Sequence, residues 1–309
     1  MIYTCTLNPS IDYIIQVNEF HLGELNKIDQ ELKFPGGKGI NVARVLNRLG
    51  VECRALGFIG GFTGNFIESY LQREKIDFDF IKVDGDSRIN IKLKTGIETE
   101  INGLGPVITN EQLEQMMKKF EQLTSEDVLV LAGSIPTSLP DDLYERIAKL
   151  CTKNDVKVVV DASGKMLLKV LEHKPFLLKP NHHELGELFD VEINNAKEAI
   201  PYAQKLIELG AENVIVSLAG KGALFINKDM VLHANVPRGE VKNSVGAGDS
   251  VVAGFIGTYI KKQNLEDAFK FGVASGSATA FSTDLCTRDE VYGLSEQILV
   301  SKNKRGEVS

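Results

Sequence analysis

A glycine-flanked stretch in the C-terminal part of the chain combines small residues with a single carboxylate. It runs from Asn243 to Phe255, and Gly246, Ala247 and Gly248 precede Asp249 at the start of an apolar helical segment. Small residues let backbone N–H groups approach a phosphate, and a helix N-terminus adds a positive field. A carboxylate in the first turn can accept a proton from an alcohol. The stretch favours phosphoryl transfer; the simpler interpretation is a helix start whose glycines only relieve crowding.

A second glycine cluster lies near the N-terminus. It runs from Pro35 to Asn41 and leads directly into an apolar segment of helical period. Gly36 and Gly37 permit a backbone that presents N–H groups to a ligand. Lys38 supplies a positive charge, and Asn41 offers a donor and an acceptor for hydroxyl groups. Neither cluster has the spacing of the P-loop or of the dinucleotide-binding glycine motif.

The composition is that of an ordinary globular protein and limits the partners. The 309 residues, 43% of them hydrophobic, can bury a large α/β core. A net charge of −7 argues against nucleic acid or an acidic membrane as partner, because both need concentrated Lys and Arg. The N-terminus lacks the features of a signal peptide, and no apolar run is long enough to span a bilayer. The four cysteines are scattered, as expected for reduced thiols, so we expect a cytoplasmic protein.

Apolar segments of strand length alternate with amphipathic segments of helix length along the chain. Several are nearly continuous Val, Ile and Leu, which is typical of parallel strands covered on both faces. Helices are predicted at Gly39–Leu49 and Asn110–Gln122, the second with a capping box formed by Thr109 and Gln112. The alternation predicts a doubly wound sheet with its site beyond the strand C-termini. The predicted strands are Ile2–Leu7, Arg54–Ile59, Val128–Ala132, Val156–Asp161, Phe176–Leu178 and Val214–Leu218.

Two stretches interrupt this alternation. Residues 11–35 and 87–104 show period-two patterning with no intervening helix, and the second turns back at Lys94-Thr95-Gly96. We expect a small separate sheet that serves as a lid over the site. Its apolar residues have no helix of their own to cover them, which suggests pairing with another sheet.

The two glycine clusters, in this order and with β segments between sheet units, resemble the PfkB/ribokinase family of sugar kinases over nearly the whole chain. Residues 36–41 look like its N-terminal signature and residues 246–249 like its C-terminal one. Between them, residues 179–184 resemble its Asn-x-x-Glu element, and residues 217–223 resemble its nucleotide-binding loop. The resemblance implies one kinase domain over residues 1–309, with a three-layer α/β/α core, a mostly parallel sheet and an inserted β-sheet lid.

The resemblance also implies ATP and Mg²⁺, and a homodimer formed through the lid. Asp249 would be the catalytic base, and the N–H groups of Gly246, Ala247 and Gly248 would stabilise the transferring phosphoryl group. Ala219 stands where the family commonly has glycine, and Asn243 where many members have aspartate. The ATP-binding residues implied are Lys179, Asn181, Ser217, Ala219, Gly220, Gly222 and Gly248, with Glu184 as an indirect magnesium ligand.

Four further segments, residues 6–12, 88–94, 102–106 and 132–136, resemble the phosphosugar branch of this family. A substrate that already carries a phosphate needs a cationic clamp, and Arg88 suits a bidentate grip best. The alternative is that the lid cations are solvated surface charges. The substrate-binding residues expected are Asp12, Lys27, Gly36, Gly37, Lys38, Asn41, Arg88 and Asn90.

The identity of the phosphosugar depends on finer detail. A ketohexofuranose has a CH₂O group on each side of its ring oxygen, so fructose 1-phosphate and tagatose 6-phosphate present similar outlines to one clamp and one aspartate. The lid segments look more similar to kinases that convert fructose 1-phosphate to fructose 1,6-bisphosphate, and we expect that reaction. Conversion of tagatose 6-phosphate to tagatose 1,6-bisphosphate stays open, as do a neutral sugar substrate and a binding protein without catalysis.

Overall fold

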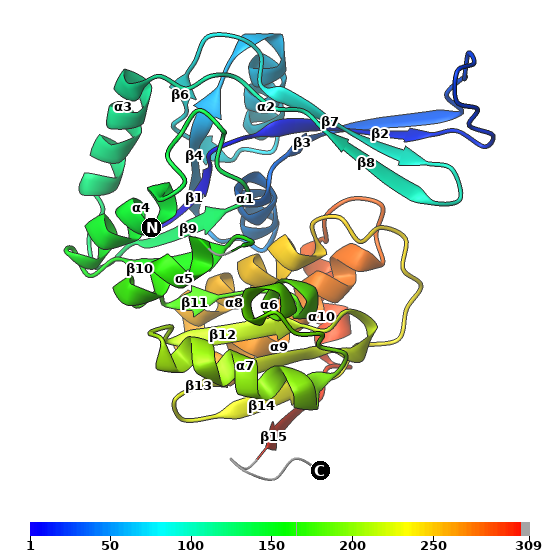
Figure 1. Ribbon diagram of the computed structural model, residues 1–309. Coiled ribbons are helices and arrows are strands. Elements are labelled where there is room, and N and C mark those ends of the chain that lie inside the picture. Colours follow the sequence, from blue (N-terminus) through cyan, green and yellow to red (C-terminus); the bar gives the residue numbers. More distant parts are fainter. Residues whose placement is uncertain (165, 304–309) are drawn as a thin grey trace.

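The computed structural model describes residues 1–164 and 166–303 (Figure 1). Within these residues the main body is built on an 11-stranded sheet of order β15-β14-β13-β12-β11-β10-β9-β1-β4-β5, with β6 also paired to β4. Its strands are β1 (Ile2–Thr6), β4 (Cys53–Ile59), β5 (Asp77–Phe78), β6 (Ile81–Lys82), β9 (Val128–Ala132), β10 (Lys157–Asp161), β11 (Leu177–Leu178), β12 (Asn213–Ser217), β13 (Ala223–Asn227), β14 (Val231–Ala234) and β15 (Val300–Asn303).

The strands from β5 to β12 are parallel, and those from β12 to β15 are antiparallel. The parallel part confirms the strands predicted from apolar segments, because strands buried on both faces need apolar residues at successive positions. The antiparallel edge was not predicted. β13 and β14 follow β12 through short turns rather than through helices, so the alternation of strand and helix stops there.

Helices cover both faces of this sheet and confirm the three-layer α/β/α architecture (Figure 1). In β9, Leu129 and Leu131 join one core cluster, while Val128 and Val130 join the other. One face is covered by α3 (Asn110–Glu121), α4 (Leu143–Thr152), α5 (Met166–Val170), α6 (His182–Phe189) and α7 (Ala196–Glu208). The other is covered by α1 (Lys38–Arg48), α2 (Gly61–Arg73), α8 (Ala247–Lys262), α9 (Leu265–Ala280) and α10 (Arg288–Ser295).

A second sheet of four strands, in the order β3-β2-β7-β8, projects sideways from this body (Figure 1). The strands are β2 (Ser10–Gln16), β3 (Gln30–Gly36), β7 (Arg88–Lys94) and β8 (Glu98–Asn102). In β7 the polar side chains of Asn90 and Lys92 are buried, whereas Ile89 is 40% exposed. The alternation thus predicted the strand correctly, but its polar side is the covered one.

The carboxyl ends of the parallel strands meet the second sheet. In the sheet, β1 lies between β4 and β9. The chain first adds β4 and β5 on one side of β1 and later adds β9 and β10 on the other, and a crevice opens where the strand order reverses in this way. None of the described helices is long and apolar enough to cross a membrane.

Candidate active site

A cavity of about 1020 Å³ lies between the second sheet and the carboxyl ends of the strands. It brings together residues from across the chain, and most of the residues expected from the sequence line it. These are Asp12, Gly37, Lys38, Asn41, Arg88, Asn90, Lys179, Asn181, Glu184, Ser217, Ala219, Gly220, Gly222, Gly246, Ala247, Gly248 and Asp249.

Asp249 lies in the first turn of α8 and is buried, with 6% of its surface exposed. Its Oδ2 accepts a hydrogen bond of 2.8 Å from Nδ2 of Asn41. Burial raises the pKa of Asp249, and the negative charge of Asp161 adds to this, while Lys38 and Asn41 lower it; the result is a pKa of about 6. At pH 7 this carboxylate is ionised and is still a stronger base than an ordinary aspartate.

The N-terminus of α8 is open to the cavity. Gly246 precedes it with a φ of 76°, a conformation that favours glycine, and no side chain caps the helix. The Ala247 N–H donates a 3.3 Å hydrogen bond to Ser244 O, whereas no acceptor within the described chain takes the Gly248 N–H. An uncapped helix start facing a cavity suits an anionic group.

A buried carboxylate holds two ammonium groups at the centre of the cavity. Asp161 ends β10 and is 1% exposed. Its Oδ1 accepts a hydrogen bond of 2.8 Å from Lys38 Nζ, and its Oδ2 lies 3.4 Å from Lys179 Nζ. Burial alone would raise the pKa of Asp161, but the two lysines outweigh it and lower that pKa. The pKa of Lys38 is raised because Asp161 and Asp249 outweigh its burial.

On the side of the second sheet, a hydrogen-bonded group surrounds Asp12. Its Oδ1 accepts a hydrogen bond of 2.8 Å from Ser10 Oγ and another of 3.1 Å from Asn90 Nδ2. Arg88 donates from Nε to Asn8 O over 3.1 Å, and from Nη1 to Gly103 O over 3.4 Å. The Asp12 carboxylate and the Arg88 guanidinium are therefore both held in fixed positions facing the cavity.

The Asn-x-x-Glu element has a structural role that the sequence analysis did not identify. Asn181 and Glu184 form a capping box at the start of α6, with the Asn181 N–H donating to Glu184 Oε2 over 2.8 Å and the Glu184 N–H donating to Asn181 Oδ1 over 2.9 Å. This N-terminus is thus already occupied by its own side chains. The start of α8 is left for an external anion.

The loop after β12 forms a tight turn beside this helix. Ala219 has a φ of 49°, a left-handed conformation that is strained for a residue with a Cβ. Gly222 has a φ of 94°, and a Cβ there would lie 2.1 Å from Ala234 O. A Cβ on Gly220 would meet nothing within 4 Å, so this part of the loop faces open space.

Two expected substrate-binding residues do not line the cavity. A Cβ on Gly36 would lie 2.2 Å from Asp12 Oδ1, so this glycine acts by letting the carboxylate pack against the backbone. Lys27 is exposed in the segment between β2 and β3, at the far end of the second sheet. Its role as a substrate-binding residue stays a prediction.

Sequence reasoning missed three charged residues that line the cavity, Asp161, Lys92 and Glu100. A signal existed for Asp161, because a lone carboxylate that ends an apolar strand lies where the sites of such sheets are found. Lys92 gave no such signal, since a lysine in an alternating strand is ordinarily a solvated surface residue.

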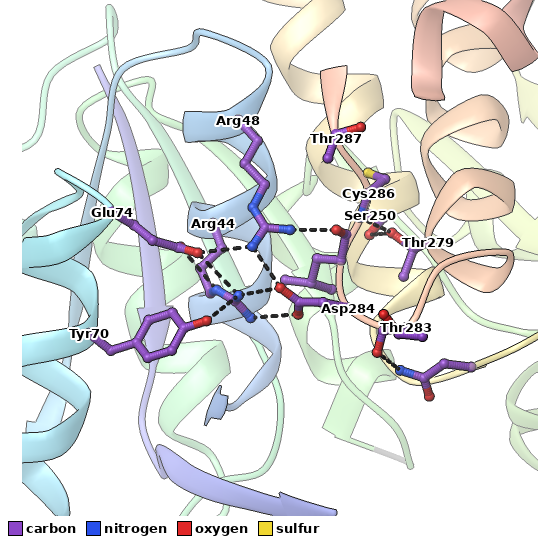
Figure 2. Close-up of polar contacts among 12 residues, drawn as sticks. Arg44, Arg48, Tyr70, Glu74, Ser250, Thr279, Thr283, Asp284, Cys286 and Thr287 are labelled. Carbon is purple, nitrogen blue, oxygen red and sulfur yellow. Dashed lines mark hydrogen bonds and ion pairs between the residues drawn. The ribbon is translucent and has the colours of Figure 1, made fainter. Parts of the chain in front are cut away.

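Behind the cavity, two arginines of α1 share two carboxylates (Figure 2). Arg44 is 1% exposed and donates to Glu74 over 3.1 Å and to Asp284 over 2.8 Å. Arg48 reaches the same pair over 2.9 and 2.7 Å, and it also donates to Leu285 O. This four-residue cluster ties α1 to the end of α2 and to the segment between α9 and α10.

These features suit phosphoryl transfer in a three-layer α/β/α fold, and comparison with known proteins identifies the family. Residues 6–290 match the pfkB family carbohydrate kinases, and the chain belongs to that family.

Relatives of known name cover nearly the whole chain. The chain is 55% identical over 302 residues to the 1-phosphofructokinase of Bacillus subtilis, covering 98% of this chain and 100% of that protein. It is 36% identical to the tagatose-6-phosphate kinase of Staphylococcus epidermidis, covering 91% of this chain and 92% of that protein. The crystal structure of Escherichia coli phosphofructokinase-2 in complex with fructose-6-phosphate is 28% identical with a TM-score of 0.89, over 96% of this chain and 98% of that one. Another structure of that enzyme is described as its tetrameric inhibited form.

Proposed function

We propose that this protein is a 1-phosphofructokinase, which transfers the γ-phosphoryl group of ATP to the C6 hydroxyl of fructose 1-phosphate. The observation that carries the proposal is the position of Asp249, buried in the first turn of α8 beside an uncapped helix N-terminus. The relative from Bacillus subtilis bears this name at 55% identity over essentially its full length, which supports the choice of substrate.

In the proposed reaction, Asp249 accepts the proton of the sugar hydroxyl as that oxygen attacks the phosphorus. One carboxylate oxygen is fixed by Asn41, which leaves Oδ1 to face the substrate. A pKa of about 6 suits this role, because the group is ionised near neutral pH and binds a proton more strongly than an ordinary aspartate. The bond from the γ-phosphorus to the bridging oxygen of ATP breaks, and ADP leaves with that oxygen.

The charge on the transferring group is stabilised by several fixed donors. The N–H groups of Gly246, Ala247 and Gly248 present the positive end of α8, and the hydrogen bond from Ala247 to Ser244 O is long enough to give way to a phosphoryl oxygen. Lys38 and Lys179, both held by Asp161, place ammonium groups beside the same turn. A Cβ on Gly248 would lie 3.2 Å from Lys179 Nζ, so glycine leaves room for this lysine.

The residues of the cavity fit a magnesium ion bound mainly by ATP oxygens and water. Asp161 Oδ2 is buried, accepts no hydrogen bond and has only the 3.4 Å ion pair with Lys179 Nζ, and a carboxylate oxygen is the kind of ligand that Mg²⁺ prefers. Glu184 would contribute through water, because its Oε2 is engaged at the Asn181 N–H. When bound, the ion neutralises phosphate charge. Among the described residues no cluster of three His, Cys, Asp or Glu side chains could hold a metal alone.

The second sheet acts, in this proposal, as a lid that excludes water once the sugar has bound. It also carries the contact of a homodimer, supported by exposed apolar side chains on the sheet and its connections. These are Leu22, Leu25, Leu32, Ile89, Ile97, Ile101 and Leu104. In such a dimer Lys27, at the far end of the sheet, lies near a partner's surface. The four free, buried cysteines are consistent with a cytoplasmic location.

An ADP-release assay with fructose 1-phosphate, fructose 6-phosphate, tagatose 6-phosphate and fructose tests the proposal. The highest kcat/KM is expected with fructose 1-phosphate, and the product should carry phosphate at C1 and C6. Tagatose 6-phosphate is the alternative substrate, favoured by the 36% identity to a tagatose-6-phosphate kinase. A higher kcat/KM with tagatose 6-phosphate would select that alternative. Turnover of fructose but of none of the three phosphosugars would refute both.

A further inference from the structure

We propose that Lys92, held by Glu100, binds the phosphate that the acceptor sugar already carries and acts there together with Arg88; this rests on the proposed function above. Lys92 lies on β7 with its side chain only 7% exposed, and it lines the cavity. An ammonium group buried this deeply is costly unless it has a charged partner. Glu100 supplies this partner, and both residues line the cavity, so the ammonium group lies beside the space that a bound anion would occupy.

The partner of Lys92 is held more loosely than Lys92 itself. Lys92 Nζ donates a hydrogen bond of 2.7 Å to Glu100 Oε1, and the Glu100 side chain on the facing strand β8 is 47% exposed. A half-exposed carboxylate is well solvated and can turn toward water. A lysine ammonium has three donors, so a phosphate can join Glu100 or replace it.

Lys92 also belongs to a row of polar side chains on one side of the second sheet. Arg88, Asn90 and Lys92 alternate along β7, so their side chains point to the same face, about 7 Å apart from one to the next. The Nε and Nη1 atoms of Arg88 donate to backbone oxygens, and its Nη2 donates to no described residue. Two cations thus flank Asn90.

The side-chain oxygen of Asn90 is a hydrogen-bond acceptor without a donor in the described chain. Its Nδ2 donates to Ser10 Oγ over 3.0 Å and to Asp12 Oδ1 over 3.1 Å, but its Oδ1 is buried without a partner in the described chain. A buried amide oxygen is ordinarily hydrogen-bonded, and a sugar hydroxyl can supply the missing donor. The row therefore matches a sugar hydroxyl at Asn90 and one phosphate in the cavity beside it, where the long side chains of Arg88 and Lys92 can both contact it.

The second sheet does not need a charge at this position for its own stability. Across the strands, Lys92 pairs with Ile14 of β2, which pairs in turn with Leu32 of β3. An apolar side chain of similar length would pack beside these residues without the desolvation that an ammonium requires. The competing interpretation is an ion pair that only joins β7 to β8.

Three variants of the full-length enzyme distinguish the two interpretations, with kcat and KM measured for fructose 1-phosphate and Kd measured by calorimetry without nucleotide. Lys92→Met should raise KM and Kd by about 10- to 100-fold, as expected for losing a charge-assisted hydrogen bond, with kcat nearly unchanged. Glu100→Gln should leave KM equal or lower, because it frees Lys92. Lys94→Met, on the same strand but outside the cavity lining, should change neither constant.

The test is decisive because KM should rise in Lys92→Met but not in Glu100→Gln. If Lys92→Met and Glu100→Gln raise KM by the same factor and lower Tm equally, the pair is only structural and the proposal is wrong. An unchanged KM in folded Lys92→Met also refutes it. If Lys92→Met fails to fold, Glu100→Gln decides alone, because a raised KM contradicts the proposal. Failure of the wild-type enzyme to use fructose 1-phosphate would instead refute the proposed function.

Discussion

Asn41 donates a hydrogen bond of 2.8 Å from Nδ2 to Asp249 Oδ2, and so connects two glycine clusters 208 positions apart in the chain. The contact fixes the carboxylate and favours its charged form. Burial and Asp161 act in the opposite direction, and together these effects raise the pKa of Asp249 to about 6. The chemistry of the site therefore depends on a balance between groups from three different elements.

The pH dependence of kcat/KM should follow the ionisation of Asp249. The carboxylate is the active form, so activity should be constant above its pKa of about 6 and fall with decreasing pH below it, approaching tenfold per unit. Steady-state kinetics between pH 5 and 8, at pH values where the enzyme stays folded, measure this acidic limb of the pH profile. A profile that stays flat down to pH 5 would show that the base has an ordinary pKa or is another group.

Two substitutions should move this limb in opposite directions. Asp161→Asn removes a negative charge that raises the pKa of Asp249, so its limb should shift to lower pH. Asn41→Ala removes a hydrogen bond that lowers the pKa, so its limb should shift to higher pH. Both should also lower kcat, because Asp161 positions two lysines and Asn41 positions the carboxylate. Shifts in the same direction would contradict this balance of charges.

The cluster of Arg44, Arg48, Glu74 and Asp284 should stabilise the fold unequally through its two arginines (Figure 2). Arg44→Met removes an arginine that is 1% exposed and leaves two carboxylates with less compensation, so the free energy of unfolding should fall by about 3 kcal/mol. Arg48→Met, at a position 21% exposed, is the matched control and should cost less. Denaturant unfolding measures both. Equal losses would show that burial of Arg44 is not what makes the cluster important.

The same cluster should weaken in acid. Burial alone would raise the pKa of Asp284, but Arg44 and Arg48 outweigh it and lower that pKa. The stabilisation from this group is therefore complete above the pKa of an unfolded aspartate, about 4, and is lost as pH falls through the lower folded value. Asp284→Asn should destabilise the protein at pH 7 and progressively less toward pH 3. A penalty that does not change with pH would contradict an ionic role.

Ala219→Gly should relieve strain in the loop after β12. Ala219 has a φ of 49°, which costs about 1–2 kcal/mol for a residue with a Cβ, against about 0.5–1 kcal/mol for the added flexibility of glycine. The variant should therefore be equally or slightly more stable. Ala223→Gly, in a buried strand, is the control and should lower Tm. A loss of stability in Ala219→Gly as large as in the control would show that this turn is unstrained.

The sequence could predict the layers and the approximate site because both depend on local patterns. The strand β9 is nearly all Val and Leu, β10 has three consecutive Val residues, and glycines before a helix indicate an exposed N-terminus. The capping box of Thr109 and Gln112 formed as predicted. The antiparallel edge from β13 to β15 could not be predicted in this way. β13 and β14 follow β12 without an intervening α-helix, which breaks the alternation on which the fold prediction depended, and β15 pairs with β14 from beyond three helices.

The parts of the site that escaped prediction depend on contacts between distant segments. Lys38 and Lys179 both reach Asp161, and no spacing in the chain indicates that meeting. In the same way, Lys92 resembles a surface residue in the sequence, but in the fold it is buried and lines the cavity. Burial of a charge is a property of the assembled fold, so the alternation that predicted the strand β7 could not show which of its faces is covered.

The central claim is that Asp249 is the catalytic base for transfer to a phosphosugar, and Asp249→Asn tests it most directly. The amide keeps the size of the side chain and can still contact Asn41 but cannot accept the proton, so kcat with fructose 1-phosphate and ATP should fall by about 100-fold or more. KM for ATP and Tm should change little. A folded Asp249→Asn enzyme with near wild-type kcat would contradict the account.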